Sequence, residues 1–212
     1  MAKSDRNGKR KNRNQVIGKR IPKMGYYLIV TDTKGTERCY FNGLYESLSD
    51  DIKAKLVIKV VETKTKNLIE KCLELTAYEA QYRIPWIVFD RDQVINFDSI
   101  IEEAISKDIK VAWSNPCFET WMFGYFGNIP AIYESWKCCD SFGNVFEKQT
   151  GQKYFKNDNN LYQKLYHFGD EQNALNQAKL KYDQCIRDGK TIPSNMCPCT
   201  TVYELVEEIR NK

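Results

Sequence analysis

The sequence has few of the features that mark several common classes of protein. It contains one histidine, His167, and its eight cysteines form no Cys-x-x-Cys pair, so we expect no structural zinc site. No apolar run reaches the roughly 18–20 residues that span a bilayer, so we expect no membrane span. The N-terminal residues lack the apolar stretch of a secretory signal. We therefore expect a cytoplasmic protein whose cysteines are reduced and packed as small hydrophobic side chains.

The composition is that of a folded globular protein. Hydrophobic residues make up 42% of the 212 residues and aromatic residues 13%, which excludes an intrinsically disordered chain. The length is enough for one domain with a substantial core, with room for an appended subdomain.

Positive charge is concentrated at the N-terminus. Residues 1–23 contain nine Lys or Arg and one acid, a net charge of +8, so the other 189 residues carry −4 of the total of +4. Such a segment could neutralise the phosphates of nucleic acid, or it could be a disordered, solubilising extension. The tail residues that we expect to contact nucleic acid are Lys9, Arg10, Lys11, Arg13, Lys19 and Arg20.

Short apolar runs alternate with segments of helical spacing in the first half of the chain. The predicted strands are residues 26–30, 56–61, 86–89 and 109–113. The predicted helices between and after them are residues 36–48, 66–82, 98–107 and 116–126, and those near the C-terminus are residues 158–167, 170–188 and 201–211. Asn115 and Pro116 read as the N-cap and first residue of one helix, and Thr201 with Glu204 as a capping box for the last.

This alternation predicts an α/β fold, a small parallel sheet of four strands flanked by helices, with a helical C-terminal layer. We divide the chain into a basic, disordered tail over residues 1–23, an α/β core over residues 24–128 and a helical part over residues 129–212 that packs on the core.

Acidic residues follow two of the predicted strands. Asp32 ends the first, and Asp90 and Asp92 end the third, two residues apart, so in an extended chain both side chains point to the same side. Ligand sites form at the carboxyl ends of parallel strands, and convergent carboxylates suit Mg²⁺. A third carboxylate could hold a second metal or accept a proton from water. The alternative is that each Asp starts a turn or caps a helix.

Four stretches, in order, resemble the RloB-like family. They are LIVTDTKGTERCYF at residues 28–41, VFDRD at 88–92, SNPCFETW at 114–121 and TTVYELV at 200–206. The resemblance implies a Toprim-type fold, which is the metal-binding α/β domain of topoisomerases, primases and certain nucleases. It also implies a role in bacterial anti-phage defence and abortive infection, with an ABC- or AAA-like ATPase as the partner subunit encoded nearby.

The resemblance assigns roles to the acidic residues. Asp90 and Asp92 match the Asp-x-Asp motif that coordinates Mg²⁺ or Mn²⁺, and Asp32 stands where Toprim domains carry a glutamate that serves as general acid or base and metal contact. Aspartate is one methylene shorter, so its carboxylate lies about 1.5 Å further back, which leaves catalytic competence open. Glu37 either compensates for this or only begins a helix.

Four further residues complete the predicted site. Glu119 lies near the start of an apolar helix, where an acid is costly to bury unless it is paired or bound to metal. Lys156 has a similar position in the family and could neutralise charge on a phosphate. Lys34 and Arg91 flank the carboxylates and could contact phosphates of nucleic acid.

The sequence leaves three functions open. The first is a metal-dependent nuclease acting on nucleic acid, RNA or tRNA among the candidates, as a defence effector. The second is a catalytically degenerate Toprim subunit that binds nucleic acid or a partner. The third is a phosphatase of the haloacid dehalogenase type, since residues 90–94 also resemble its Asp-x-Asp-x-[Thr/Val] signature, with Asp90 as nucleophile and Asp92 as acid or base.

Overall fold

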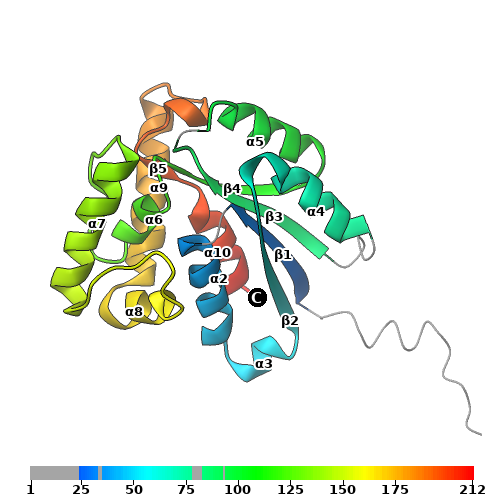
Figure 1. Cartoon of the computed structure of the whole chain (residues 1–212), viewed down its shortest axis with the longest axis horizontal. Coiled ribbons are helices and arrows are strands. Elements are labelled where there is room, and N and C mark those ends of the chain that lie inside the picture. Colours follow the sequence, from blue (N-terminus) through cyan, green and yellow to red (C-terminus); the bar gives the residue numbers. More distant parts are fainter. Residues whose placement is uncertain (1–23, 33–34, 78–82, 93) are drawn as a thin grey trace, which may run out of the picture.

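A mixed sheet of five strands forms the centre of the molecule (Figure 1). The computed structural model describes residues 24–32, 35–77, 83–92 and 94–212. The strands are β1 (Gly25–Asp32), β2 (Leu56–Thr63), β3 (Arg83–Asp90), β4 (Lys110–Asn115) and β5 (Cys199–Thr200). They lie in the order β2-β1-β3-β4-β5, and the first four are parallel. Their carboxyl ends therefore share one edge of the sheet, as the strand–helix alternation predicts.

The predicted four-stranded sheet is wrong in its strand count. The two residues of β5 pair antiparallel with β4, with Ser114 opposite Thr200 and Asn115 opposite Cys199. A strand of two residues has no periodicity that a sequence pattern could reveal. The α/β class and the mostly parallel arrangement are confirmed.

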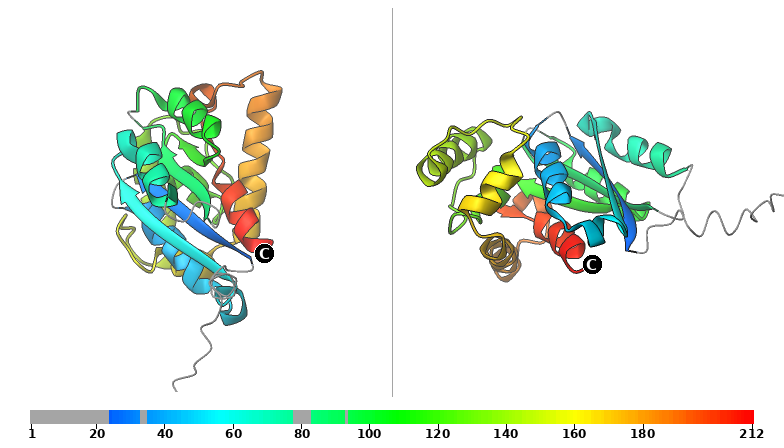
Figure 2. Two further views of the ribbon diagram at one scale, coloured as in Figure 1. Left: turned by 90° about the vertical axis from the view of Figure 1, so that its right-hand side faces the viewer. Right: turned by 90° about the horizontal axis from the view of Figure 1, so that it is seen from below.

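Helices cover both faces of the sheet because β1 and β3 are apolar on both sides. Leu28 and Val30 belong to the core under α4 (Leu68–Ala77) and α5 (Phe97–Ser106). Tyr27 and Ile29 belong to the core under α2 (Thr36–Ser47) and α10 (Val202–Arg210). Figure 2 shows the two pairs of helices on opposite sides of the sheet. These four residues of β1, Tyr27 to Val30, are fully buried.

The C-terminal part is mainly helical. Beyond α6 (Glu119–Phe123) lie α7 (Ser135–Thr150), α8 (Leu161–Phe168) and α9 (Glu171–Arg187), with α7 and α8 at one end of the molecule (Figure 1). The sequence does not predict α7. The short elements are α3 (Asp50–Lys53) and the 3₁₀ turns η1 (Thr65–Asn67) and η3 (Pro193–Asn195). The division at residues 128 and 129 stays a prediction.

The helix start predicted at Asn115 is wrong, and Thr201 is the N-cap residue of α10 but lacks the predicted side-chain cap, because both polar side chains are used in other contacts. Asn115 is the last residue of β4, and its amide donates to the carbonyls of Pro193 and Ser194 (both 3.2 Å), so α6 begins only at Glu119. The Thr201 hydroxyl accepts from the Trp113 amide (2.9 Å) instead of capping α10. The predicted helix over residues 66–82 is η1 followed by α4, and residues 78–82 lie outside the described ranges.

Two expectations from the sequence concern membrane-spanning helices and the state of the cysteines. Among the described residues, none of the helices is long and apolar enough to cross a membrane. The eight cysteines all lie in described ranges as free thiols, and six of them are buried.

Candidate metal-binding active site

A cavity of about 390 Å³ opens at the carboxyl ends of β1 and β3. It is lined by five of the predicted site residues, Asp32, Asp90, Asp92, Glu119 and Lys156. These residues come from positions up to 124 apart in the chain, and the parallel strands and the start of α6 bring them together. The lining also includes residues that were not predicted as site residues, among them Thr36, Glu37 and Thr65.

Asp32 is held at the end of β1 by one of its two carboxylate oxygens. Its Oδ2 accepts a hydrogen bond from the Thr65 hydroxyl at the start of η1 (2.5 Å). Its Oδ1 is buried and has no hydrogen-bond partner in the described part of the chain. One oxygen therefore orients the side chain and the other remains available in the cavity.

Asp90 is arranged in the same way on the adjacent strand. Its Oδ2 accepts from the backbone amide of Phe118 (3.0 Å), and its Oδ1 is buried without a partner among the residues described. Burial raises the pKa of Asp90 well above its usual range, and the nearby carboxylates of Glu37 and Glu119 raise it further. A buried carboxylate with a free oxygen is costly unless a proton or a cation neutralises it.

Asp92 lies at the mouth of the cavity, but the chain does not reach it in extended form. β3 ends at Asp90, and Asp92 has a φ of +24°, while its backbone amide donates to the Pro116 carbonyl (3.0 Å). The argument that an extended chain places both carboxylates on one side is therefore wrong. Both residues still line the same cavity, because the backbone turns after β3. Aspartate is one of the residue types that tolerate positive φ.

Glu119 is the first residue of α6 and is 1% exposed. Its Oε1 accepts from the Tyr154 hydroxyl (2.8 Å) and lies 3.3 Å from the Lys156 ammonium. Burial raises the pKa of Glu119, but Lys156 and the hydrogen bonds to it outweigh burial and hold the pKa below its usual range. A buried acid at this position is costly unless it is paired or bound to metal, and in the structure its charged partner is Lys156.

Lys156 follows α7 in a segment that also contains Tyr154. Burial lowers its pKa, but the pairing with Glu119 dominates and raises the pKa above the ordinary lysine value. The ammonium therefore stays charged at neutral pH. It places a positive charge in a cavity whose lining includes Glu119 and four other acids.

Glu37 is one of these acids and was predicted only as a possible substitute for the missing glutamate. It lies in the first turn of α2 and is 7% exposed. Burial raises its pKa to about 7, and repulsion from Glu119 and Asp32 contributes, against its own backbone amide and Lys156, which lower it. The sequence could not separate this role from a helix start, since acids are favoured in the first turn by the helix dipole. Nothing in the sequence marked Thr65 or Tyr154.

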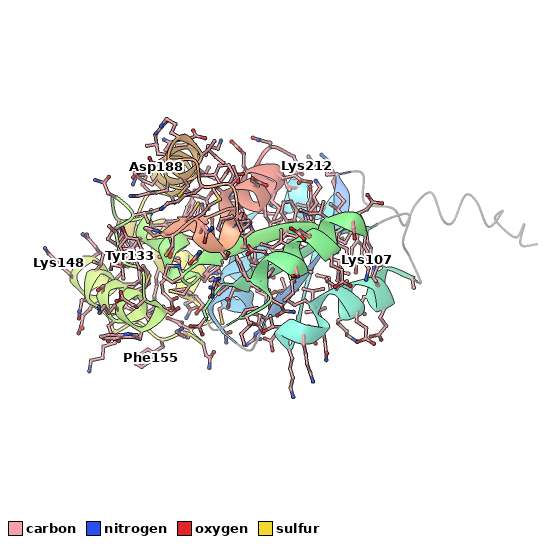
Figure 3. The ribbon with its side chains drawn as sticks, turned by 90° about the horizontal axis from the view of Figure 1, so that it is seen from above. Lys107, Tyr133, Lys148, Phe155, Asp188 and Lys212 are labelled. Atoms are coloured by element: carbon pink, nitrogen blue, oxygen red, sulfur yellow. The ribbon has the colours of Figure 1, made fainter. Side chains whose placement is uncertain are left out.

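Arg91 lies outside this cavity, in a second surface hollow of about 420 Å³ that shares Asp92 with it. The aromatic side chains of Tyr133 and Trp136 also line this hollow and are 60% and 65% exposed. Figure 3 shows Tyr133 at the α7 end of the molecule, far from Lys107 on α5. Lys34 and the predicted tail residues Lys9, Arg10, Lys11, Arg13, Lys19 and Arg20 lie outside the described residues.

The donor set of the main cavity fits a hard divalent cation. Asp32 and Asp90 both line the cavity, and each has one buried oxygen without a partner in the described ranges, while Asp92 supplies a third carboxylate. Mg²⁺ and Mn²⁺ prefer such oxygen ligands. Neither free oxygen has a donor among the residues that the structure describes, so these residues fit a bound cation better than a purely structural network.

A comparison with protein families shows which family the chain belongs to. The model of the RloB-like protein family matches residues 27–209, which is most of the sequence. The chain belongs to the RloB-like protein family. In this RloB-like chain the matched region includes all of the cavity residues named above. Searches of the curated proteins and of the solved structures found no match to the chain.

Proposed function

We propose that this RloB-like chain is a Mg²⁺- or Mn²⁺-dependent nuclease with a Toprim-type site that hydrolyses phosphodiester bonds in nucleic acid. The observation that supports it is the pair of buried oxygens, one on Asp32 and one on Asp90, that have no partner in the described part of the chain and lie at the ends of two adjacent parallel strands. Buried carboxylate oxygens without donors are rare in a structural role, because each costs free energy unless a ligand satisfies it.

Asp32, Asp90 and Asp92 would hold the cation in this proposal. A bound divalent cation supplies Lewis-acid polarisation of a phosphate and activation of a water molecule. The protein contributes the orientation of its ligands: Thr65 fixes Asp32, and the Phe118 amide fixes Asp90. These hydrogen bonds leave the free oxygens in one place before any ligand arrives, which lowers the cost of ordering the site.

Glu37 is the best-placed proton acceptor of the described residues in the cavity. Its pKa of about 7 is close to neutral pH, where a general base is most effective. Asp32 is one methylene shorter than the glutamate of the Toprim pattern, and Glu37 reaches the same cavity from the start of α2. We therefore assign the proton-accepting role to Glu37 and the metal-contacting role to Asp32.

Lys156 would stabilise charge on the phosphate. Its ammonium stays protonated next to Glu119, so it acts as a positive charge and not as a base. Glu119 is held by Lys156 and Tyr154, and its pKa is low. Its part in the reaction is then to position the Lys156 ammonium.

The second hollow supports nucleic acid as the substrate. It adjoins the cavity through Asp92 and combines the guanidinium of Arg91 with the exposed rings of Tyr133 and Trp136. Cationic and aromatic side chains together bind the phosphates and bases of single-stranded nucleic acid. The +8 charge of residues 1–23 would add attraction to phosphates.

The biological setting of the proposal comes from the family resemblance. In this setting the protein would be an anti-phage defence effector in the cytoplasm. It would cleave DNA or RNA, with tRNA among the RNA candidates, and would work with an ABC- or AAA-like ATPase subunit. The phosphatase alternative gives Asp32 no role, although Asp32 lines the same cavity as Asp90. The degenerate-subunit alternative predicts cation binding without turnover.

A cleavage assay tests the proposal. The full chain, alone and with the ATPase encoded nearby, is incubated with total tRNA, single-stranded DNA and plasmid in Mg²⁺ or Mn²⁺. We expect cleavage that EDTA abolishes and that Asp90→Ala/Asp92→Ala removes, while the surface variant Asp140→Asn on α7 retains it. Cleavage by the double variant would overturn the site assignment. No cleavage with the ATPase present would favour the degenerate subunit.

A further inference from the structure

Two cysteine sulfurs lie close together beside the acidic cavity. Cys117 is in the turn between β4 and α6, and Cys139 is in the second turn of α7. Their Sγ atoms are 4.0 Å apart. Cys117 is 3% exposed, whereas Cys139 is half-buried and lines a surface hollow of about 610 Å³ next to Phe155, whose place at the α7 end is marked in Figure 3. Small solutes can therefore reach Cys139 and not Cys117.

A positively charged group, the ammonium of Lys156, lies beside the two sulfurs. The Lys156 ammonium lines the same hollow as Cys139 and pairs with Glu119, whose carboxylate lies within 4.8 Å of both thiols. The contact with Cys117 and the charge of Lys156 lower the pKa of Cys139, while burial and the Glu119 carboxylate raise it. The neighbouring thiols of Cys138 and Cys139 and burial raise the pKa of Cys117. Because an ammonium already occupies this cluster, thiolate chemistry is favoured over binding of a metal cation.

Cys197 provides a comparison within the same chain. It is the other half-buried thiol among the eight, and burial raises its pKa to about 11. Among the described residues it has no counterpart of the Cys117 contact, and its thiol donates to the carbonyl of Tyr133 (3.9 Å). A thiol of this kind is largely protonated and unreactive at neutral pH.

We propose that Cys139 is an oxidation site for peroxides and that Cys117 is its resolving partner. The Cys139 thiolate attacks one oxygen of hydrogen peroxide, the O–O bond breaks, and hydroxide leaves to give the sulfenic acid. The Cys117 sulfur then attacks the Cys139 sulfur, the S–O bond breaks, and hydroxide leaves with the Cys117 proton as water. In total two thiols and one peroxide give one disulfide and two waters. The oxidation does not require nuclease activity, although Lys156 lines both the cysteine site and the acidic cavity.

Trypsin makes the product easy to recognise. Cleavage after Lys110, Lys137 and Lys148 places Cys117 in the peptide of residues 111–137 and both Cys138 and Cys139 in that of residues 138–148. The full chain, reduced and freed of reductant, is treated with one equivalent of hydrogen peroxide at pH 7.5, blocked with N-ethylmaleimide and analysed by mass spectrometry. We expect the two peptides to appear linked, and dithiothreitol to separate them.

Variants assign the link to one of the adjacent cysteines. Cys138→Ser should keep the linked peptides, and Cys139→Ser should abolish them. Cys117→Ser should leave Cys139 as a sulfenic acid that dimedone traps. A link that persists in Cys139→Ser, or that is absent from the wild type, would overturn the proposal.

A measurement on the unmodified protein does not depend on whether a variant folds. With reduced wild-type chain and limiting iodoacetamide at pH 7.5, we expect Cys139 to be alkylated at least about tenfold faster than Cys197. Equal rates at the two thiols, or a faster Cys197, would contradict the assignment of Cys139 as the reactive thiol.

Discussion

The ammonium of Lys156 lies 3.3 Å from the carboxylate of Glu119, which is almost completely buried. The two residues are 37 positions apart and come from α6 and the segment after α7. This ion pair links the C-terminal helices to the edge of the sheet where Asp32 and Asp90 end their strands. It also determines the charge of the cavity, because Lys156 is the only cation lining it in the part of the chain that is described.

Lys156→Ala should destabilise the protein. Of the two side-chain partners described above for the buried Glu119 carboxylate, the change would remove one and leave the other, the Tyr154 hydroxyl. Loss of one partner from a fully buried pair costs several kcal/mol, but Lys156 is 56% exposed, so we expect about 1–2 kcal/mol. Urea unfolding at pH 7.5 measures this change. Lys153→Ala, at a nearby exposed lysine, should stay within about 0.5 kcal/mol of wild type, and an equal loss for both variants would contradict the role of the pair.

Glu37→Gln should stabilise the metal-free protein at alkaline pH. The folded chain holds a proton on Glu37 up to a pKa of about 7, whereas the unfolded chain releases it near 4.5. Folded protein therefore binds more protons between these values, and wild-type stability falls as pH rises through this window. At pH 8 the glutamine variant should be more stable by roughly 1–3 kcal/mol, and at pH 4 the two should be alike. Unfolding curves at both pH values in EDTA test this, and a constant difference would refute it.

Cation affinity should increase with pH. The raised pKa values of Asp90 and Glu37 mean that the cavity holds protons near neutrality, and a cation must displace them. Between pH 6 and pH 8 we expect the dissociation constant for Mn²⁺ to fall by at least about tenfold. Isothermal titration in buffers of different ionisation enthalpy should also show proton release. Affinity that does not change with pH would mean that these groups are not neutralised by protons.

Asp32→Asn separates the nuclease from the phosphatase alternative. In the proposed nuclease this change removes a metal contact, so cleavage should fall by about a hundredfold or more, a loss of roughly 2.7 kcal/mol in transition-state stabilisation. In a phosphatase with Asp90 as nucleophile the change would be nearly silent. Parallel assays of nucleic acid cleavage and of phosphomonoester hydrolysis distinguish the two. Full nuclease activity in Asp32→Asn would exclude the role given to Asp32.

The sequence was sufficient for those parts of the site that follow directly from single strands. Apolar runs that end in aspartate predicted where Asp32 and Asp90 would lie, because parallel strands place their carboxyl ends together. The positions of Asp92 and β5 could not be obtained in this way. A turn with positive φ carries no periodic signal, and a two-residue strand exists only because β4 offers it partners.

The remaining parts depend on contacts between distant segments. Glu37 resembles an ordinary helix start in the sequence, and its burial depends on how α2 packs beside Glu119 and Asp32. Tyr154 bonds to Glu119 from 35 residues away, so no local pattern reveals it. The same holds for Cys117 and Cys139, which the turn before α6 and the helix α7 bring together. Local patterns determine elements, whereas such contacts are determined by tertiary packing.

Binding of Mn²⁺ to the full chain tests the central claim most directly. Titration followed by thermal unfolding should show stabilisation that approaches 2.7 kcal/mol at about 100 times the dissociation constant. Asp90→Asn and Asp32→Asn, which keep the shape of the side chain and remove its charge, should each abolish most of this stabilisation, while Asp140→Asn should keep it. Stabilisation by Mn²⁺ that is unchanged in both Asp90→Asn and Asp32→Asn would show that the cation binds elsewhere and would contradict the account.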